Sequence, residues 1–164
     1  MKYFAYGSNM SLLRLRKRVP SANRLGLFYL EQHDLRFHKA SIDGSAKCDA
    51  FQTRHQKDSV IGALFEIDKR EKAALDITEG VGYGYDEKLV NLSSESGDIL
   101  AAFTYCATKI DPSLKPYSWY LNHVIVGAKE MGVPKEYLQK IQSIESREDA
   151  DLKRDAEEGY VTGR

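Results

Sequence analysis

Two short segments of the sequence carry residues that could do chemistry on a small polar molecule. The first is Tyr6-Gly7-Ser8-Asn9-Met10, which follows a short apolar run. A turn placed between a strand and a helix exposes consecutive backbone N–H groups, which can bind a carboxylate or a developing oxyanion. The alternative interpretation is an ordinary capped turn, because glycine, serine and asparagine commonly precede helices.

The second segment contains Glu79, which ends a predicted short helix and precedes Gly80, Gly82 and Gly84. A carboxylate among flexible glycines and aromatic residues can be partly removed from water. Its pKa would then rise toward neutrality, and the group could work as a base. The alternative is a solvated glutamate at a helix end, with Asp76 as no more than a surface partner.

Tyrosines lie beside or between these segments, at Tyr6, Tyr85, Tyr105, Tyr117 and Tyr120. Their apolar rings can pack into a core while their hydroxyls face a cleft, which suits a small polar substrate. Most buried tyrosines, however, only fill a core. The tyrosine pattern therefore supports a binding site only in combination with the two segments above.

Composition narrows the range of partners. Lysine plus arginine and aspartate plus glutamate number 24 each, so no net field draws the chain to nucleic acid or anionic lipid. The apolar run before Gly7 is too short for a signal peptide or a membrane span, which indicates a cytoplasmic protein.

Cys48 and Cys106 lack the spacing of a redox or zinc pair, and the four histidines lack metal-ligand spacing. We therefore expect no metal.

The elements that must position these residues follow from hydrophobic patterning. The predicted strands cover residues 2–6, 25–30, 35–38, 60–67, 85–92 and 99–107. The predicted helices run from Met10 to before Pro20, from Lys69 to Asp76, from Tyr117 to Met131 and from Pro134 to about Ile144.

Several features of these elements can be predicted in more detail. The strands 25–30 and 35–38 read as a hairpin, and 60–67 as a central strand buried on both faces. The basic residues of the first helix read as its solvated face. The whole chain, 1–164, reads as a single α+β domain with a mixed, mainly antiparallel sheet, and residues 145–164 as a peripheral charged tail.

Three segments in this order resemble the γ-glutamyl cyclotransferase family. They are Tyr3 to Met10, Leu75-Asp76 with Glu79-Gly80-Val81, and Gly127 to Tyr137, and the match extends from Tyr3 to about Ile144. Asn9 points to the true cyclotransferase branch, since related γ-glutamylamine and ChaC-type enzymes usually carry leucine at that position. The resemblance implies a small closed β-barrel with flanking helices and no cofactor.

The resemblance also implies roles for individual residues. Glu79 would be the catalytic acid and base, in a cleft floored by Tyr6, Gly7, Ser8 and Asn9, the last three of which hold the γ-glutamyl group. Family tyrosines that line the pocket match Tyr105 and Tyr120. A further family tyrosine falls at either Tyr83 or Tyr85, and Tyr85 is favoured because a strand follows it.

The chemistry implied by the family agrees with the residue types present. The α-amino group of the substrate attacks its own γ-carbonyl, so the products are 5-oxoproline and a free amino acid, and no catalytic serine, cysteine or metal is required. The amine has a reference pKa of about 7.7–8.0, so a base must remove its proton. The resemblance implies a cytoplasmic enzyme of glutathione metabolism, monomeric or homodimeric, with a small-molecule substrate. A γ-glutamylamine or glutamylated natural product as substrate, or a non-catalytic binding protein, remain alternatives.

Overall fold

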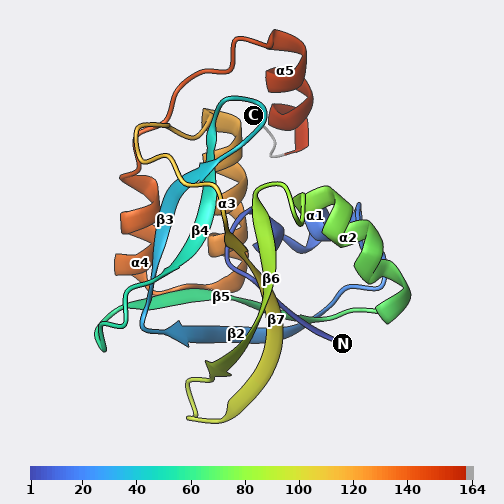
Figure 1. Cartoon of the computed structure of the whole chain (residues 1–164), viewed down its shortest axis with the longest axis vertical. Helices are drawn as coiled ribbons and strands as arrows, with labels where there is room; N and C mark the ends of the chain where they lie inside the picture. Colours follow the sequence, from blue (N-terminus) through green and yellow to red (C-terminus); the bar gives the residue numbers. More distant parts are fainter. Residues whose placement is uncertain (162–164) are drawn as a thin grey trace.

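Five strands close into a small barrel in the computed structural model, which describes residues 1–161 (Figure 1). Around the barrel the strands follow the order β1 (Lys2–Ala5), β5 (Ser59–Glu66), β2 (Asn23–Glu31), β6 (Tyr85–Ser93) and β7 (Ile99–Ala107). All neighbours pair antiparallel except β1 and β7, which pair in parallel and close the barrel. The predicted α+β class with a mainly antiparallel barrel is therefore confirmed.

Strand β5 is buried on both faces, as its apolar run predicts. It pairs with β1 on one side and β2 on the other, and Val60, Leu64 and Phe65 are fully buried. Gly62 gives the barrel room, because a Cβ there would lie 2.5 Å from the carbonyl oxygen of Ala5 and 2.8 Å from the Phe4 ring. A larger residue at this position would force β1 and β5 apart.

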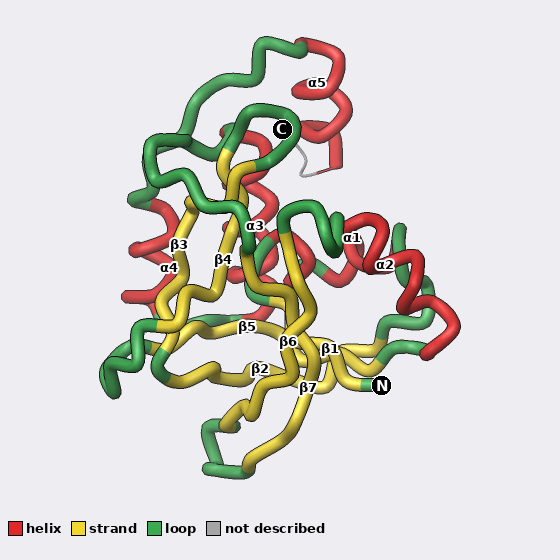
Figure 2. The backbone as a smooth tube through the Cα atoms, viewed as in Figure 1, coloured by secondary structure: helices red, strands yellow, loops and turns green. Residues whose placement is uncertain are grey.

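Strands β3 (His33–Ala40) and β4 (Ala46–Gln52) form a separate two-stranded ribbon that rises from the barrel (Figure 2). The predicted hairpin of 25–30 with 35–38 is therefore wrong, because β2 pairs within the barrel and β3 pairs with β4. The chain turns at Gln32, which has a φ of 59°, and leaves the barrel there. Asp49 ties the ribbon back, since it accepts hydrogen bonds from His38 and from the N–H of Ala107, both at 2.8 Å.

The first predicted helix is shorter than expected. A 3-10 turn, η1 (Ser8–Met10), is followed by α1 (Leu12–Arg16), and between them Ser11 adopts an extended conformation. Arg16 and Lys17 are exposed as expected, but Arg14 is buried and pairs with Glu158. Treating the whole basic cluster as solvated was therefore wrong.

The remaining helices flank the barrel and the ribbon. They are the 3-10 turn η2 (Lys69–Glu71) and the helices α2 (Lys72–Glu79), α3 (Ser118–Met131), α4 (Lys135–Gln142) and α5 (Leu152–Val161). Helix α5 lies at the far end from the barrel, where Glu158 reaches Arg14 and His123 (Figure 1). None of the helices described within residues 1–161 is long and apolar enough to cross a bilayer.

Helix α3 holds the turn that follows β1. A Cβ at Gly127 would lie 2.7 Å from the Cβ of Met10 and 2.8 Å from the backbone nitrogen of Ser11, so only glycine permits this approach. One turn further on, Glu130 accepts hydrogen bonds from the Ser11 hydroxyl at 2.9 Å and from the N–H of Leu12 at 3.2 Å. The segment around Gly127 therefore positions residues 7–12.

Candidate active site

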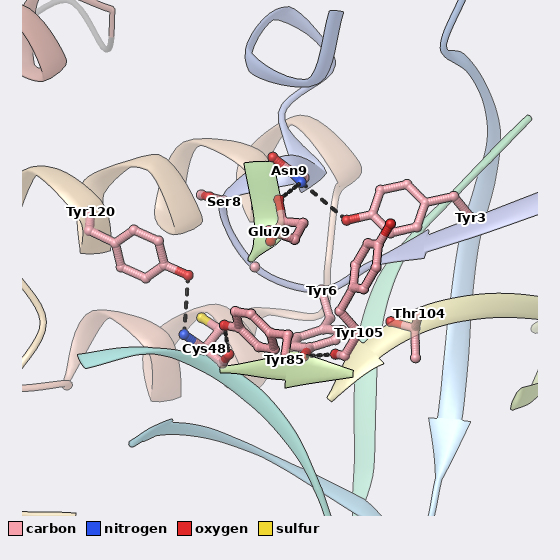
Figure 3. A pocket seen from close by; sticks show the side chains of 11 residues that line it. Tyr3, Tyr6, Ser8, Asn9, Cys48, Glu79, Tyr85, Thr104, Tyr105 and Tyr120 are labelled. Carbon is pink, nitrogen blue, oxygen red and sulfur yellow. Dashed lines mark hydrogen bonds between the residues drawn. The ribbon is translucent and has the colours of Figure 1, made fainter. Parts of the chain in front are cut away.

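A small cavity of about 30 Å³ opens where the end of β1, helix α2 and the ribbon meet (Figure 3). We call it the inner chamber. Its lining residues are Tyr3, Tyr6, Gly7, Ser8, Asn9, Cys48, Glu79, Tyr85, Thr104, Tyr105 and Tyr120. The structure thus brings together the residues to which the resemblance gave roles, whereas Tyr117 lies outside this chamber and donates its hydroxyl proton to the carbonyl oxygen of Asp43 at 2.9 Å. Tyr3, Cys48 and Thr104 were not singled out, and of these only Tyr3 lay inside a recognised motif.

Glu79 is the last residue of α2, which ends because Gly80 takes a left-handed conformation with a φ of 72°. Its side chain is 19% exposed, and Oε1 accepts a hydrogen bond of 2.8 Å from Nδ2 of Asn9. Arg18 lies close by, with Nη1 3.8 Å from the same oxygen. The carboxylate therefore faces the cavity beside residues 7–9, and the guanidinium offsets part of the cost of burying it.

The Asn9 side chain links three residues of the site. Its Nδ2 donates to Glu79 and, at 3.1 Å, to the hydroxyl of Tyr3, while its Oδ1 accepts from Nη1 of Arg18 at 2.5 Å. The side-chain amide is therefore committed to the protein. Figure 3 shows this amide between the Glu79 carboxylate and the Tyr3 hydroxyl. Arg18, which the sequence analysis placed on a solvated face, is part of the site.

A second contact anchors the end of α2. Asp76 lies one turn before Glu79, and its Oδ1 accepts a hydrogen bond of 2.7 Å from the Tyr105 hydroxyl. Lys72 donates to the same carboxylate, at 2.7 Å to Oδ2. Asp76 is therefore more than a surface partner, because it ties the helix that carries Glu79 to strand β7.

The tyrosine hydroxyls divide into two groups. Those of Tyr6, Tyr85 and Tyr105 donate to protein acceptors, the first two to the carbonyl oxygens of Tyr105 and Cys48. Those of Tyr3 and Tyr120 accept, from Asn9 and from the N–H of Cys48. The Tyr120 hydroxyl also shares a side-chain hydrogen bond with the Cys48 thiol, so the Tyr3 O–H proton is the one left to serve a ligand. Burial raises the pKa of both phenols, which keeps these protons in place at neutral pH.

Of the two candidate tyrosines after Glu79, the structure places Tyr85 in the cavity. Its side chain is buried, whereas that of Tyr83 is 81% exposed. Tyr85 begins β6, and Tyr83 lies in the preceding turn. The start of a regular strand was therefore the signal that distinguished them.

Cys48 lines the inner chamber with its backbone and its side chain. Burial is the main cause that raises the pKa of its thiol to about 12, so the group stays protonated at neutral pH and is a poor nucleophile. A Cβ at Gly7 would lie 3.2 Å from the Cβ of Cys48 and 3.3 Å from the Tyr120 oxygen. The turn and the ribbon are therefore in contact across the chamber.

A larger hollow of about 240 Å³ adjoins the first, and we call it the outer chamber. The two share Ser8, Glu79, Tyr85 and Tyr120. The rest of the outer lining is Arg14, Arg18, Lys39, Ser41, Asp43, Lys47, Thr78, Trp119 and Glu158. Four of these residues are cations, and no sequence motif marked them. Glu79 therefore stands between a chamber rich in hydroxyls and a chamber rich in positive charge.

The described residues, 1–161, contain no group of three histidine, cysteine, aspartate or glutamate side chains placed to hold a metal ion. Both thiols, Cys48 and Cys106, are free. The groups that line the two chambers are carboxylates, hydroxyls, a thiol, backbone amides and cations.

Comparison with known proteins gives consistent matches. A family model described as the AIG2-like family matches residues 59–141. The γ-glutamylcyclotransferase of Bos taurus is 32% identical and that of Homo sapiens 31%, each over 87% of this chain and 78% of its own length. A solved structure described as a γ-glutamyl cyclotransferase superposes with a TM-score of 0.82 at 30% identity, and covers 89% of this chain and 88% of its own.

Proposed function

Because this chain belongs to the AIG2-like family and, within it, to the γ-glutamylcyclotransferases, we propose that it converts γ-glutamyl amino acids to 5-oxoproline and a free amino acid. The observation that carries the proposal is the position of Glu79, whose carboxylate faces the same cavity as residues 7–9. A cyclotransferase needs a base and an oxyanion site at one substrate carbonyl, and this arrangement supplies both.

In the proposed reaction, the α-amino nitrogen of the γ-glutamyl group attacks its own γ-carbonyl carbon and closes a five-membered ring. Glu79 takes a proton from the α-ammonium group before attack. The bond between the γ-carbonyl carbon and the leaving nitrogen then breaks as Glu79 gives its proton to that nitrogen, and the ring nitrogen releases its own extra proton to solvent, from which the free amine takes up a proton. The nucleophile belongs to the substrate, so the protonated Cys48 thiol is not needed.

The remaining inner-chamber residues bind and orient the γ-glutamyl group in this proposal. The turn of Gly7, Ser8 and Asn9 supplies backbone N–H groups for the carbonyl oxygen as it becomes negative. The hydroxyl of Tyr3 is a further donor, since it is not committed to a protein acceptor in the way that the Tyr105 hydroxyl is. Tyr6, Tyr85 and Tyr105 keep the shape of the cavity, because their hydroxyls are bonded to the protein.

Asn9 and Arg18 are positioning residues in the proposal. The Asn9 amide donates to one carboxylate oxygen of Glu79, which leaves the other available for the substrate amine. Arg18 stabilises the negative charge that returns to Glu79 once the proton has passed to the leaving group. These roles explain why the Asn9 side chain is bonded to the protein rather than free in the cavity.

The cellular setting is also part of the proposal. We expect the enzyme to be a monomer or a homodimer. The two free thiols suit a reducing compartment, in line with the proposed cytoplasmic location. A role in glutathione metabolism, on a small molecule and without a cofactor, is proposed from the family alone.

The test is the Glu79→Gln variant, which keeps the shape of the side chain but cannot carry the proton. We expect 5-oxoproline release from γ-glutamyl-alanine to fall about 100-fold to 10,000-fold, in the range for loss of a general acid and base. Thermal-shift titration with the same dipeptide should still show binding. Glu95→Gln, at an exposed turn residue, is the matched control and should keep full activity. Unchanged turnover in Glu79→Gln would falsify the role of Glu79.

A further inference from the structure

The four cations of the outer chamber differ in whether they have partners. Arg14 pairs with Glu158 at 2.7 Å, Arg18 donates to Asn9 at 2.5 Å, and Lys47 pairs with Asp43 at 2.8 Å. Lys39 is the exception. Across residues 1–161, its ammonium has neither a hydrogen-bond acceptor nor a carboxylate within ion-pairing distance, and its closest described interaction is with the Tyr85 ring, 4.7 Å to the centroid.

Burial disfavours the Lys39 ammonium, as it disfavours the cations of Arg18 and Lys47. Lys39 is only 8% exposed, and burial lowers the pKa of its ammonium despite the opposing influence of Glu79 and Asp43. A buried cation without an anionic partner is destabilising, so its retention at the wall of a chamber indicates a ligand that supplies the missing anion.

The surrounding chain makes room for the lysine at this place. The end of its side chain passes over Gly84, where a Cβ would lie 2.7 Å from Cε and 2.9 Å from Nζ. Behind it is the ring of Tyr85, which lines both chambers. Lys39 therefore reaches the boundary between the chambers, on the outer side of Glu79.

We propose that Lys39 binds the α-carboxylate of the leaving amino acid, and so makes the enzyme select γ-glutamyl amino acids over γ-glutamylamines. This inference rests on the proposed function, which puts the γ-glutamyl half in the inner chamber and the scissile amide at Glu79. The leaving group then extends into the outer chamber. In an amino acid the carboxylate is two bonds from the scissile nitrogen, whereas a simple amine carries no anion at that position.

The position of Lys39 outside the inner chamber decides which carboxylate it serves. A γ-glutamyl amino acid has two, one on the γ-glutamyl half and one on the leaving half. Lys39 lines only the outer chamber, while the turn of residues 7–9 lines the inner one. A lysine that instead held the γ-glutamyl carboxylate would affect all γ-glutamyl substrates equally, and this difference can be measured.

The experiment compares γ-glutamyl-alanine with γ-glutamyl-alaninamide, which differ only at the leaving carboxylate. Values of kcat/KM are measured by 5-oxoproline release for wild type, for Lys39→Met and for Lys109→Met. Lys109 is exposed, and its positive charge lowers the pKa of the Lys39 ammonium, but it does not line the outer chamber. The ratio of kcat/KM for the acid over the amide should fall about tenfold to a hundredfold in Lys39→Met and stay within about twofold of wild type in Lys109→Met.

Each outcome separates this inference from the proposed function. An equal loss on both substrates in Lys39→Met, or no loss, would overturn the role of Lys39 while leaving the cyclotransferase reaction intact. Absence of 5-oxoproline from wild type with every γ-glutamyl compound would overturn both. Wild type alone provides a test that does not depend on how the variant folds, because it should prefer the acid over the amide by at least about tenfold. Equal use of the two would also overturn the inference.

Discussion

The inner and outer chambers share four residues but are built in different ways. The inner chamber is lined by the end of β1, the end of α2 and strand tyrosines, and most of its polar groups bond to one another. The outer chamber collects cations from α1, the ribbon and the segment between them and receives an acidic side chain from α5. The inner network holds its shape before a ligand arrives, whereas the outer chamber has one cation, Lys39, without an anionic partner among residues 1–161 and so can set a preference for charge.

The largest expected effect among the variants that test this difference is on the inner network. Asn9→Ala removes the donor to Glu79 and Tyr3 and frees Arg18 to approach the carboxylate. We expect kcat to fall about tenfold to a hundredfold, with a smaller change in KM, because the reacting group loses its orientation. Steady-state kinetics with γ-glutamyl-alanine measures both values.

Asn91→Ala provides the matched control for that variant, since Asn91 is an exposed residue of β6 far from both chambers along the strand. Its kinetics should equal those of wild type. If Asn9→Ala kept its kcat, the inner chamber would not depend on the network, and the contrast with the outer chamber would disappear.

The next largest effect concerns the helix that supports the inner chamber. Gly127→Ala places a methyl group 2.7 Å from Met10 and 2.8 Å from the Ser11 backbone, and the backbone cannot yield easily. We expect the free energy of unfolding to fall by about 1–3 kcal/mol, as for other overpacked contacts, and turnover to fall as the turn shifts. Urea unfolding measures the first, and 5-oxoproline release measures the second.

Asn122→Ala, on the same helix, lacks this conflict and should change the unfolding free energy by less than about 0.5 kcal/mol. A stable and fully active Gly127→Ala variant would show that the turn is held by other contacts, such as those of Glu130.

The smallest effect is expected on the free energy of unfolding, for a substitution of Glu158 at the edge of the outer chamber. Glu158 is hydrogen-bonded to His123 and paired with Arg14, and together these contacts outweigh burial and lower its pKa to about 2. A carboxyl whose pKa is lowered on folding adds stability above its unfolded pKa, and that stability is lost as the pH falls through the folded value. Glu158→Gln should therefore cost about 1 kcal/mol at pH 7, and the cost should shrink between about pH 4.5 and pH 2.

Urea unfolding of wild type and Glu158→Gln at pH 7 and pH 3 measures this change. Glu157→Gln, an exposed neighbour in the same helix, is the control and should show no such dependence. A cost for Glu158→Gln that stayed constant with pH would mean that the contact acts through shape rather than charge.

The same contrast explains which features the sequence could predict. Strand β5 was predicted because it is buried on both faces and therefore nearly continuously apolar, and β6 and β7 because each pairs across a short polar turn. The ribbon was not predicted, because β3 and β4 mix charged and small residues and their pairing depends on contacts such as His38 with Asp49. Contacts between residues far apart in the sequence leave no trace in the local hydrophobic pattern, so that pattern cannot predict them.

The candidate site divides in the same way. Gly7, Ser8, Asn9 and Glu79 belong to segments whose order along the chain resembles a known family, so their meeting could be expected. Arg18 was misplaced, because helical periodicity was continued through Ser11, where the chain is extended. Lys39 carried no local signal, since its proposed role depends on having no anionic partner within the described residues, 1–161, once the chain has folded.

The two hydrogen bonds to the Cys48 backbone limit where residues can be inserted or deleted near the ribbon. The N–H of Cys48 bonds to Tyr120 and its carbonyl oxygen to Tyr85, so one peptide segment of β4 is held from two sides. An inserted or deleted residue within β4 would shift its register and break both contacts. The 41–45 turn is also held, through Asp43 and Gly44. Natural length variation near the ribbon should therefore collect in the largely exposed stretch 53–58, where an added residue disturbs neither tyrosine.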